Sequence, residues 1–193
     1  MSHNRGFVQT VEVTRWSTRD LSPEFLTTKS GIFFTWDAMT FYKVFVYGTL
    51  KKGEPNHGWF SKSTGGHHKF LYNGRTKEKF PLIIGTRYNI PFLLHSPGQG
   101  HNVKGEVYEV DDKVLADLDV LEDHPNFYVR GLYEVEDVDQ PDQKSESVWI
   151  YTIRTFKKEL LSQTLFESYS NFDRHGLKYH ESEVDESSLA DLQ

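Results

Sequence analysis

The stretch KVFVYGTLKKGEPNHG, Lys43 to Gly58, joins an apolar run to a glycine-containing loop. Its first residues are β-branched or aromatic and predict a strand. Gly48 and Gly53 follow with the G-x-x-x-x-G spacing of a phosphate-binding loop, which needs Lys and then Ser or Thr after the second glycine. Glu54 and Pro55 stand there instead. A carboxylate repels phosphate and proline lacks a backbone N–H, so we reject a nucleotide-binding loop.

The same stretch allows a second interpretation, in which the loop binds a smaller anion. The strand ends in YGTL, Tyr47 to Leu50, where Gly48 is free to take backbone dihedrals that other residues avoid. Successive backbone N–H groups in such a turn can point into a cavity and bind a carboxylate. An ordinary strand-to-loop turn explains the same residues, so the pattern alone leaves both interpretations open.

Composition limits the class of protein. A chain of 193 residues is long enough for one domain with a sizeable core, and its aromatic share of 15% favours a packed sheet or barrel. The net charge of −6 provides no basic footprint for nucleic acid. The sequence has no cysteine, which excludes disulfides, thiolate nucleophiles and zinc–thiolate sites.

No segment is typical of export or of membrane insertion. No apolar run approaches the roughly 20 residues that a membrane-spanning helix needs. The first residues, MSHNRGFVQTVEVTRW, lack the apolar core of a secretion signal. We therefore expect a soluble, cytoplasmic protein of the cytosol, monomeric and without a membrane or nucleic-acid partner.

Three segments differ in composition. Residues 1–38 are polar and rich in turn-forming residues, which predicts an N-terminal extension that is partly disordered. Strand-forming runs begin after Met39, so a folded domain is predicted for residues 39–180. Residues 181–193 are acidic and predict a frayed tail.

Strand signals dominate the predicted domain. Residues 103–110, VKGEVYEV, alternate apolar and polar side chains as a half-buried strand does. Residues 126–138 and 147–156 predict a hairpin around the polar loop DQPDQKSES. Further strand-like runs, bounded by glycine or proline, occupy residues 43–48, 68–77 and 80–89.

One helix is predicted over DDKVLADLDVLED, residues 111–123. Asp111 or Asp112 can cap it, and His124-Pro125 ends it because a residue before proline avoids helical geometry. The residues that share its apolar face, at about 100° per residue, are Val114, Leu115, Leu118 and Leu121.

Glu122 is placed by the same periodicity inside that apolar face, between Leu115 and Leu118. Burial disfavours an ionised carboxylate and raises its pKa, which suits proton transfer near neutral pH. The alternative is a structural role, in which Glu122 reaches solvent or binds a nearby arginine.

Other catalytic patterns are missing from the sequence. His67 and His68 are adjacent, so their side chains diverge, and no H-E-x-x-H motif occurs. No G-x-S-x-G motif of a serine hydrolase occurs either. We predict neither a metal site nor a serine triad.

Several motifs, in order along most of the chain, identify a resemblance to a known family. The sequence resembles the γ-glutamylcyclotransferase, AIG2-like family. YGTL marks the family as a whole, whereas KKGEPN together with NIPFLL favours its γ-glutamylaminecyclotransferase branch. The matching stretches are VFVYGTLKKGEPN (44–56), YNIPFLL (88–94), VKGEVYEV (103–110), LDVLEDHPNFYVR (118–130) and HGLKYH (175–180).

The resemblance implies an α+β fold, a small mixed β-barrel flanked by a few helices. It also implies that Glu122, in the family pattern L-D-x-[LF]-E, is the catalytic residue. The YGTL residues Tyr47, Gly48, Thr49 and Leu50 are implied to bind the glutamyl or 5-oxoproline moiety. Amine specificity is expected around Asn89-Ile90-Pro91 and Tyr128.

The implied activity is that of a lyase, which cyclises a γ-glutamylamine to 5-oxoproline without metal, cofactor or covalent intermediate. The implied substrate is γ-glutamyl-ε-lysine, the remnant of isopeptide degradation after transglutaminase cross-links are digested. A close alternative is a cyclotransferase acting on γ-glutamyl amino acids or glutathione. A second alternative is a non-catalytic small-molecule-binding module of the same fold, against which the presence of Glu122 argues.

Overall fold

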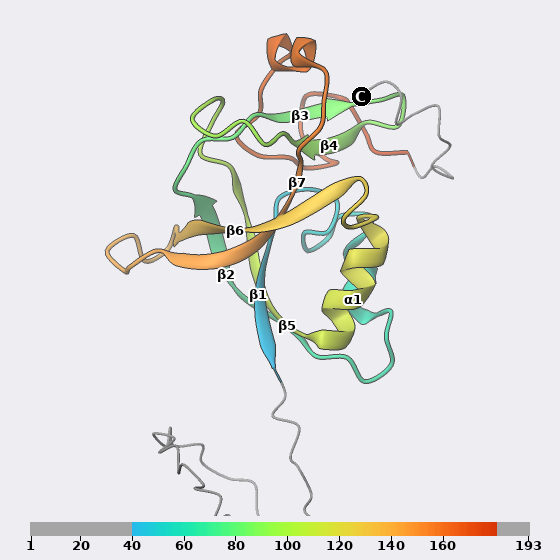
Figure 1. Cartoon of the computed structure of the whole chain (residues 1–193), viewed down its shortest axis with the longest axis vertical. Coiled ribbons are helices and arrows are strands. Elements are labelled where there is room, and N and C mark those ends of the chain that lie inside the picture. The colour runs from blue at the N-terminus through green and yellow to red at the C-terminus, as the bar shows by residue number, and fades with distance from the viewer. Residues whose placement is uncertain (1–39, 181–193) are drawn as a thin grey trace, which may run out of the picture. The chain divides into compact units, whose positions relative to one another are not determined.

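A five-stranded closed barrel forms the centre of the computed structural model, which describes residues 40–180 (Figure 1). The strand order is β1-β5-β2-β6-β7, and β1 closes the barrel by pairing in parallel with β7. The other neighbouring strands pair antiparallel. The predicted mixed barrel is thus confirmed. Its strands are β1 (Phe41–Val46), β2 (His68–Thr76), β5 (Lys104–Asp111), β6 (Tyr128–Asp137) and β7 (Glu146–Ile153).

The apolar run of β1 is buried on both of its faces. Val44 and Val46 belong to one hydrophobic cluster, together with Leu118 of the helix α1. Phe45 and Tyr47 belong to a second cluster, because successive side chains of a strand point to opposite sides. This two-sided burial explains why the opening motif is continuously apolar instead of alternating.

The helix α1 (Asp112–Leu121) is shorter than the sequence predicts. Asp111 caps it as expected, accepting a hydrogen bond from the Val114 N–H at 3.0 Å. The helix ends before His124-Pro125, because Glu122 is already its C-terminal cap and Asp123 adopts a φ of 45°. Glu122 is thus the cap of the helix and not one of its interior residues. Its N–H still donates to the Leu118 carbonyl at 3.0 Å, so the residue continues the last turn, and the backbone reverses at Asp123.

A separate hairpin, β3 (Leu82–Gly85) and β4 (Ile90–Leu93), lies beside the barrel (Figure 1). The predicted strand at 80–89 corresponds to β3 alone, since Thr86 and Asn89 turn the chain with φ values of 60° and 56°. The β4 strand has no counterpart among the strands expected from the sequence. The hairpin is one side of the candidate site described below.

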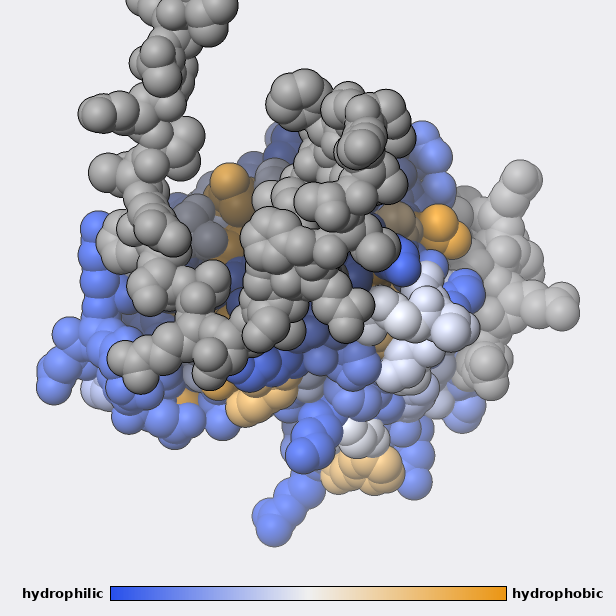
Figure 2. Space-filling view, turned by 90° about the horizontal axis from the view of Figure 1, so that it is seen from below, coloured by the Kyte–Doolittle hydropathy of each residue, from blue (hydrophilic) through white to orange (hydrophobic). Residues whose placement is uncertain are grey.

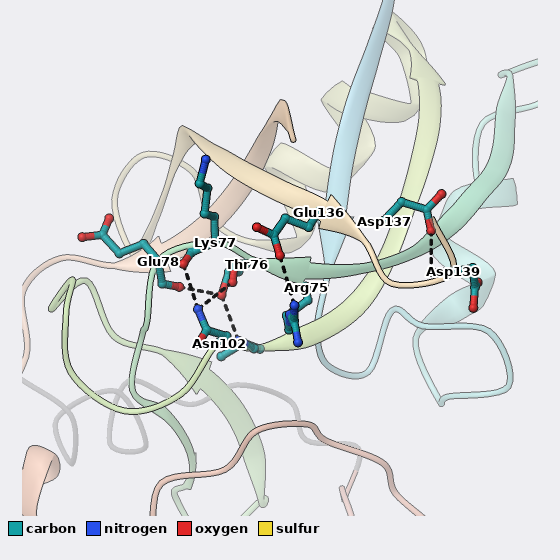
Figure 3. Close-up of polar contacts among 9 residues, drawn as sticks. Arg75, Thr76, Lys77, Glu78, Asn102, Glu136, Asp137 and Asp139 are labelled. Atoms are coloured by element: carbon teal, nitrogen blue, oxygen red, sulfur yellow. Dashed lines mark hydrogen bonds and ion pairs between the residues drawn. The ribbon is translucent and has the colours of Figure 1, made fainter. Parts of the chain in front are cut away.

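The connection from β2 to this hairpin is fixed by buried polar contacts (Figure 3). The fully buried Thr76 hydroxyl donates to the Glu78 carbonyl at 2.7 Å and accepts from the Val103 N–H at 2.8 Å. The Asn102 side-chain amide donates to the carbonyls of Thr76 and Lys77, at 3.0 and 2.8 Å. These contacts satisfy the backbone where the chain leaves the barrel.

Two short 3₁₀ helices complete the described elements: η1 (His57–Ser61) lies between β1 and β2, and η2 (Lys158–Ser162) follows β7. The C-terminal segment, residues 163–180, comes directly after η2 and runs past the β3–β4 hairpin (Figure 1). The Asn89 side chain donates to the Lys178 carbonyl at 2.8 Å, and the His180 N–H donates to the Tyr88 carbonyl at 3.0 Å. The hairpin turn therefore holds the end of this segment in place.

The predicted hairpin of β6 and β7 is confirmed, with Tyr128 opposite Ile153 at one end of the ladder.

The exposed large apolar side chains come from separate elements, including Phe41 of β1 and Val120 of α1. One face, seen in Figure 2, is largely hydrophilic with small separate hydrophobic groups. No helix among residues 40–180 is long and apolar enough to cross a membrane. The predicted extension (1–38) and tail (181–193) lie outside the described residues.

Candidate active site

A cavity of about 250 Å³ opens where β1 ends, between the YGTL turn, the β4 strand and the end of α1. This volume lies just below the range of roughly 300 to 1,000 Å³ that is usual for drug-sized ligands, so the cavity suits a small molecule. Most of its wall is apolar or aromatic. The lining residues are Phe45, Val46, Tyr47, Gly48, Thr49, Leu50, Asn56, Thr86, Ile90, Pro91, Phe92, Leu121, Glu122, Asp123, Phe127, Tyr128, Tyr151 and Tyr179.

All four YGTL residues line this cavity. The sequence suggested that glycine at position 48 allows unusual backbone dihedrals, but the φ of Gly48 is not in the left-handed region. A Cβ on Gly48 would lie only 2.6 Å from Pro91 Cγ, so glycine is needed for the close approach of the two walls. Within residues 40–180, the backbone N–H groups of Gly48, Thr49 and Leu50 donate no hydrogen bond. These donors remain available to a ligand.

Contacts within the KKGEPN segment hold the YGTL turn. The Asn56 N–H donates to the Thr49 carbonyl at 2.9 Å, and its side-chain amide donates to Thr49 Oγ1 at 3.0 Å. Glu54, which excludes a phosphate loop, is buried and accepts the Asn171 N–H at 3.0 Å. The carboxylate thus has a structural role between this loop and the C-terminal segment.

Glu122 is half-buried and faces the cavity from the end of α1. Its carboxyl receives no hydrogen bond from any residue between 40 and 180. Burial among apolar groups raises the pKa of Glu122 to about 8, because desolvation disfavours the charged form. The carboxyl thus has the basicity that proton transfer near neutral pH requires.

Tyr47, Tyr128 and Tyr151 line the cavity with Glu122, and each of their hydroxyls has another partner, which for Tyr151 is Asp119 Oδ1 at 2.7 Å. The Tyr47 hydroxyl donates to the Tyr151 carbonyl at 3.0 Å, and the Tyr128 hydroxyl donates to the Pro91 carbonyl at 3.4 Å. Burial is the main reason why the pKa values of Tyr47 and Tyr128 lie well above the usual value, and the nearby charge of Glu122 raises both of them further. These hydroxyls therefore stay neutral and act only as hydrogen-bonding groups.

The family model described as "Gamma-glutamyl cyclotransferase, AIG2-like" matches residues 44–171, which include the second half of β1, the other barrel strands, the YGTL turn and Glu122. The chain belongs to this family. It is a cyclotransferase, as the motifs imply.

Relatives of this cyclotransferase come from several animals. A Drosophila melanogaster protein with a provisional gamma-glutamylcyclotransferase name is 50% identical over a matched region that covers 67% of this chain and 80% of that protein. The gamma-glutamylaminecyclotransferase of Mus musculus is 42% identical and covers 71% of this chain and 95% of its own length. The crystal structure of an AIG2-like protein from Mus musculus, 41% identical, matches with a TM-score of 0.70 over 75% of this chain and 99% of that one.

The cyclotransferase has cavity residues that sequence reasoning did not find. Tyr151 and Tyr179 reach the site from β7 and from the C-terminal segment, far from the YGTL turn in sequence. Tyr179 lies in the matching stretch HGLKYH, but the motif gave it no role, and no motif singled out Tyr151. Only the tertiary fold brings the two residues to the cavity. Of the segments expected to set amine specificity, Ile90, Pro91 and Tyr128 line the cavity.

Asn89, which was expected with them, is not part of the cavity wall. It instead holds the C-terminal segment of the cyclotransferase through the Lys178 carbonyl. Among residues 40–180, no three His, Asp or Glu side chains are grouped as ligands of a metal ion.

Proposed function

We propose that this cyclotransferase converts γ-glutamylamines to 5-oxoproline and a free amine, with Glu122 as general acid and base. The α-nitrogen of the glutamyl group attacks its own γ-carbonyl carbon and closes a five-membered ring. The bond from that carbon to the amine nitrogen then breaks. Glu122 takes one proton from the α-ammonium group, which frees the lone pair for attack, and delivers it to the departing amine nitrogen. The ring nitrogen loses a second proton as it becomes the lactam N–H, and this proton passes through Glu122 to the released amine, which leaves as an ammonium ion.

The basicity of Glu122 is the observation that carries this proposal. The α-ammonium group at a peptide terminus has a pKa of about 8, and an adjacent carboxylate raises it further. An ordinary carboxyl lies about 3.5 pKa units below that, so accepting the proton costs about 5 kcal/mol. With the pKa of Glu122 raised to about 8, most of this cost disappears.

The YGTL turn is proposed to hold the glutamyl end of the substrate. The free N–H groups of Gly48, Thr49 and Leu50 suit a carboxylate or the oxyanion that develops at the γ-carbonyl. A well-placed donor to a developing oxyanion contributes about 3–4 kcal/mol to catalysis. Because ring closure is intramolecular, the cavity contributes mainly by folding the substrate into the reactive shape.

The charges on the cavity wall favour a leaving amine that has no carboxylate next to its nitrogen. Glu122 and Asp123 are acidic, and none of the lining residues within 40–180 is Lys, Arg or His. A γ-glutamyl amino acid carries a carboxylate close to the bond that breaks, where this wall offers no cationic partner. We therefore favour γ-glutamyl-ε-lysine, whose departing lysine side chain is apolar next to the reacting nitrogen, over γ-glutamyl amino acids or glutathione.

The provisional name of the Drosophila relative keeps γ-glutamyl amino acids and glutathione as the second candidate substrates. A catalytically silent binding module is the third alternative. We also propose that the enzyme acts as a monomer in the cytosol.

A 5-oxoproline release assay tests the proposal. The substrates are γ-glutamyl-ε-lysine, γ-glutamyl-alanine and glutathione, and the enzymes are wild type, Glu122→Gln and the control Glu159→Gln. Glu159 is exposed on η2. We expect Glu122→Gln to lose at least about 10²-fold in kcat while its fold is retained, and Glu159→Gln to match wild type.

Equal turnover by wild type and Glu122→Gln would refute the mechanism. Faster turnover of γ-glutamyl-alanine than of γ-glutamyl-ε-lysine would instead support the second candidate. No turnover of any of the three substrates by wild type would leave the binding module.

A further inference from the structure

The C-terminal segment brings Tyr179 to the cavity, and hydrogen bonds fasten the backbone on both sides of this residue. The Lys178 carbonyl accepts a hydrogen bond from the Asn89 side chain at 2.8 Å, and the His180 N–H donates to the Tyr88 carbonyl at 3.0 Å. Both partners lie in the turn of the β3–β4 hairpin. These contacts hold Tyr179 against the hairpin turn.

A third contact fixes Tyr179 from within the segment. Its N–H donates to Asn171 Oδ1 at 2.6 Å, and the Asn171 N–H donates in turn to Glu54 Oε2 at 3.0 Å. The buried Glu54 belongs to the loop that follows the YGTL turn, so the segment is tied to two walls of the cavity. Residues 178–180 take part in these contacts only with backbone atoms, so a change of the Tyr179 side chain leaves all of them in place.

The Tyr179 side chain is partly exposed and lines the cavity. Thr86 and Ile90, which flank the hairpin turn, line it as well and are also partly exposed. Burial is the main reason for the raised pKa of Tyr128, and Glu122 and Tyr179 are among the nearby groups that add to it. Tyr179, Thr86 and Ile90 thus form a rim of the cavity on the side of the hairpin, within electrostatic reach of the reacting groups.

The proposed function leaves this rim to the leaving amine. The N–H groups of the YGTL turn and the Glu122 carboxyl are assigned to the glutamyl half, which all candidate substrates share. In γ-glutamyl-ε-lysine the departing nitrogen carries an apolar chain of methylene groups, whereas the charged end of that lysine has to stay in water. A partly exposed aromatic ring suits both parts, because it can cover the chain while the charged end reaches solvent.

We infer that Tyr179 is a specificity-determining residue, whose ring packs on the aliphatic chain of the leaving amine. The inference rests on the proposed function and narrows its substrate class to amines with a long unbranched chain. Each methylene group that leaves water favours binding by up to about fourfold. Because the chain is bound in the ground state and in the transition state alike, kcat/KM should increase with chain length.

The test compares γ-glutamyl-methylamine, γ-glutamyl-butylamine and γ-glutamyl-hexylamine in the 5-oxoproline assay. We expect kcat/KM of wild type to rise along this series. In Tyr179→Ala it should fall by at least about tenfold for the hexylamine and by no more than about twofold for the methylamine. The matched control is Phe172→Ala, which should follow wild type, because Phe172 is an aromatic residue of the same segment that is 76% exposed and not part of the cavity wall.

Tyr179→Phe separates the ring from the hydroxyl. The Tyr179 hydroxyl has no hydrogen-bond partner within residues 40–180, so this change removes no internal contact, and we expect wild-type kinetics. An equal loss for all three substrates, in Tyr179→Phe or in Tyr179→Ala, would overturn the inference, because it would indicate a contact with the shared glutamyl half or a merely structural role. Unchanged kinetics in Tyr179→Ala would overturn it as well. If Tyr179→Ala does not fold, Tyr179→Leu replaces it, with a loss of about threefold expected for the hexylamine alone.

Failure of the proposed function would give a different result. Retained turnover in Glu122→Gln would refute the role of Glu122, yet the chain-length series in Tyr179→Ala would still test the rim. If wild type turned over none of the substrates, calorimetry would measure the affinities of wild type and Tyr179→Ala for the same series. A larger loss of affinity for the hexylamine than for the methylamine would support the inference, and equal affinities or no binding would overturn it.

Discussion

Gly48 and Pro91 face each other so closely that a Cβ on Gly48 would lie 2.6 Å from Pro91 Cγ. The YGTL turn and the β4 strand therefore set the width of the cavity between them. A methyl group at this position must displace one wall, although the backbone conformation itself suits any residue.

Gly48→Ala is expected to lower kcat/KM by at least about tenfold and to destabilise the fold by about 1–3 kcal/mol. The matched control is Gly58→Ala, because a Cβ there meets nothing within 4 Å. Thermal unfolding and the 5-oxoproline assay measure both effects. Wild-type kinetics in Gly48→Ala would show that the contact does not shape the site.

The pH dependence of kcat/KM is expected to be bell-shaped. Productive binding pairs ionised Glu122 with the substrate ammonium group, so activity rises as pH passes the Glu122 pKa of about 8 in the free enzyme. Activity falls again above the pKa of the substrate ammonium group. A pH series on wild type measures both limbs, and an acidic limb near the ordinary carboxyl value of 4.5 would contradict the burial of Glu122.

Stability is expected to fall with rising pH because of the same carboxyl. Its folded pKa, about 8, lies above the unfolded value of about 4.5, so the folded state holds an extra proton between these values. The free energy of unfolding therefore decreases across this window as pH rises. Glu122→Gln removes the effect, so we expect the variant to match wild type near pH 4.5 and to exceed it at pH 8.

The expected gain at pH 8 is about 1–3 kcal/mol, reduced by water that reaches the carboxyl through the cavity. Chemical denaturation at both pH values measures it, with Glu159→Gln as the control that should follow wild type. A constant difference between Glu122→Gln and wild type at all pH values would show that Glu122 titrates normally.

Asp123 is expected to repel anionic leaving groups. It lines the cavity with a φ of 45°, a conformation that asparagine also tolerates, and its Oδ1 accepts a hydrogen bond from Asn126 that an amide oxygen can keep. Asp123→Asn thus removes the charge alone. We expect kcat/KM for γ-glutamyl-alanine to rise about threefold to tenfold relative to that for γ-glutamyl-ε-lysine.

Asp142→Asn is the control for this change, because Asp142 is exposed in the loop between β6 and β7. The ratio of the two substrates should be unaffected there. A ratio that is unchanged in Asp123→Asn would remove Asp123 from the basis of amine preference.

Local patterns predicted the barrel strands and β3, but not β4. β1, β2, β5, β6 and β7 follow from apolar runs, alternation and turn residues, all of which act over a few positions. The β4 strand contains Pro91, which argues against a strand in a sequence pattern. Within residues 40–180, β4 pairs with β3 alone in a sheet of two strands, and an edge strand tolerates proline.

The candidate site was predictable only in part, and not always for the right reason. Helical periodicity singled out Glu122, yet the helix ends one residue before it. Its N–H donates to the Leu118 carbonyl as in a helical turn, which is why the periodicity was informative although the helix has ended. Tyr151 is separated from its partner Asp119 by 32 positions, so no short-range pattern could link the two.

The C-terminal segment also has a consequence for synthesis on the ribosome. Glu54 holds Asn171, Asn171 Oδ1 accepts the Tyr179 N–H at 2.6 Å, and Tyr179 is part of the cavity wall. A nascent chain can form its barrel strands by Ile153, but the pocket lacks one side until Tyr179 has emerged from the exit tunnel. Prematurely terminated products would therefore carry the general base and the anion cradle yet still have an incomplete reaction chamber.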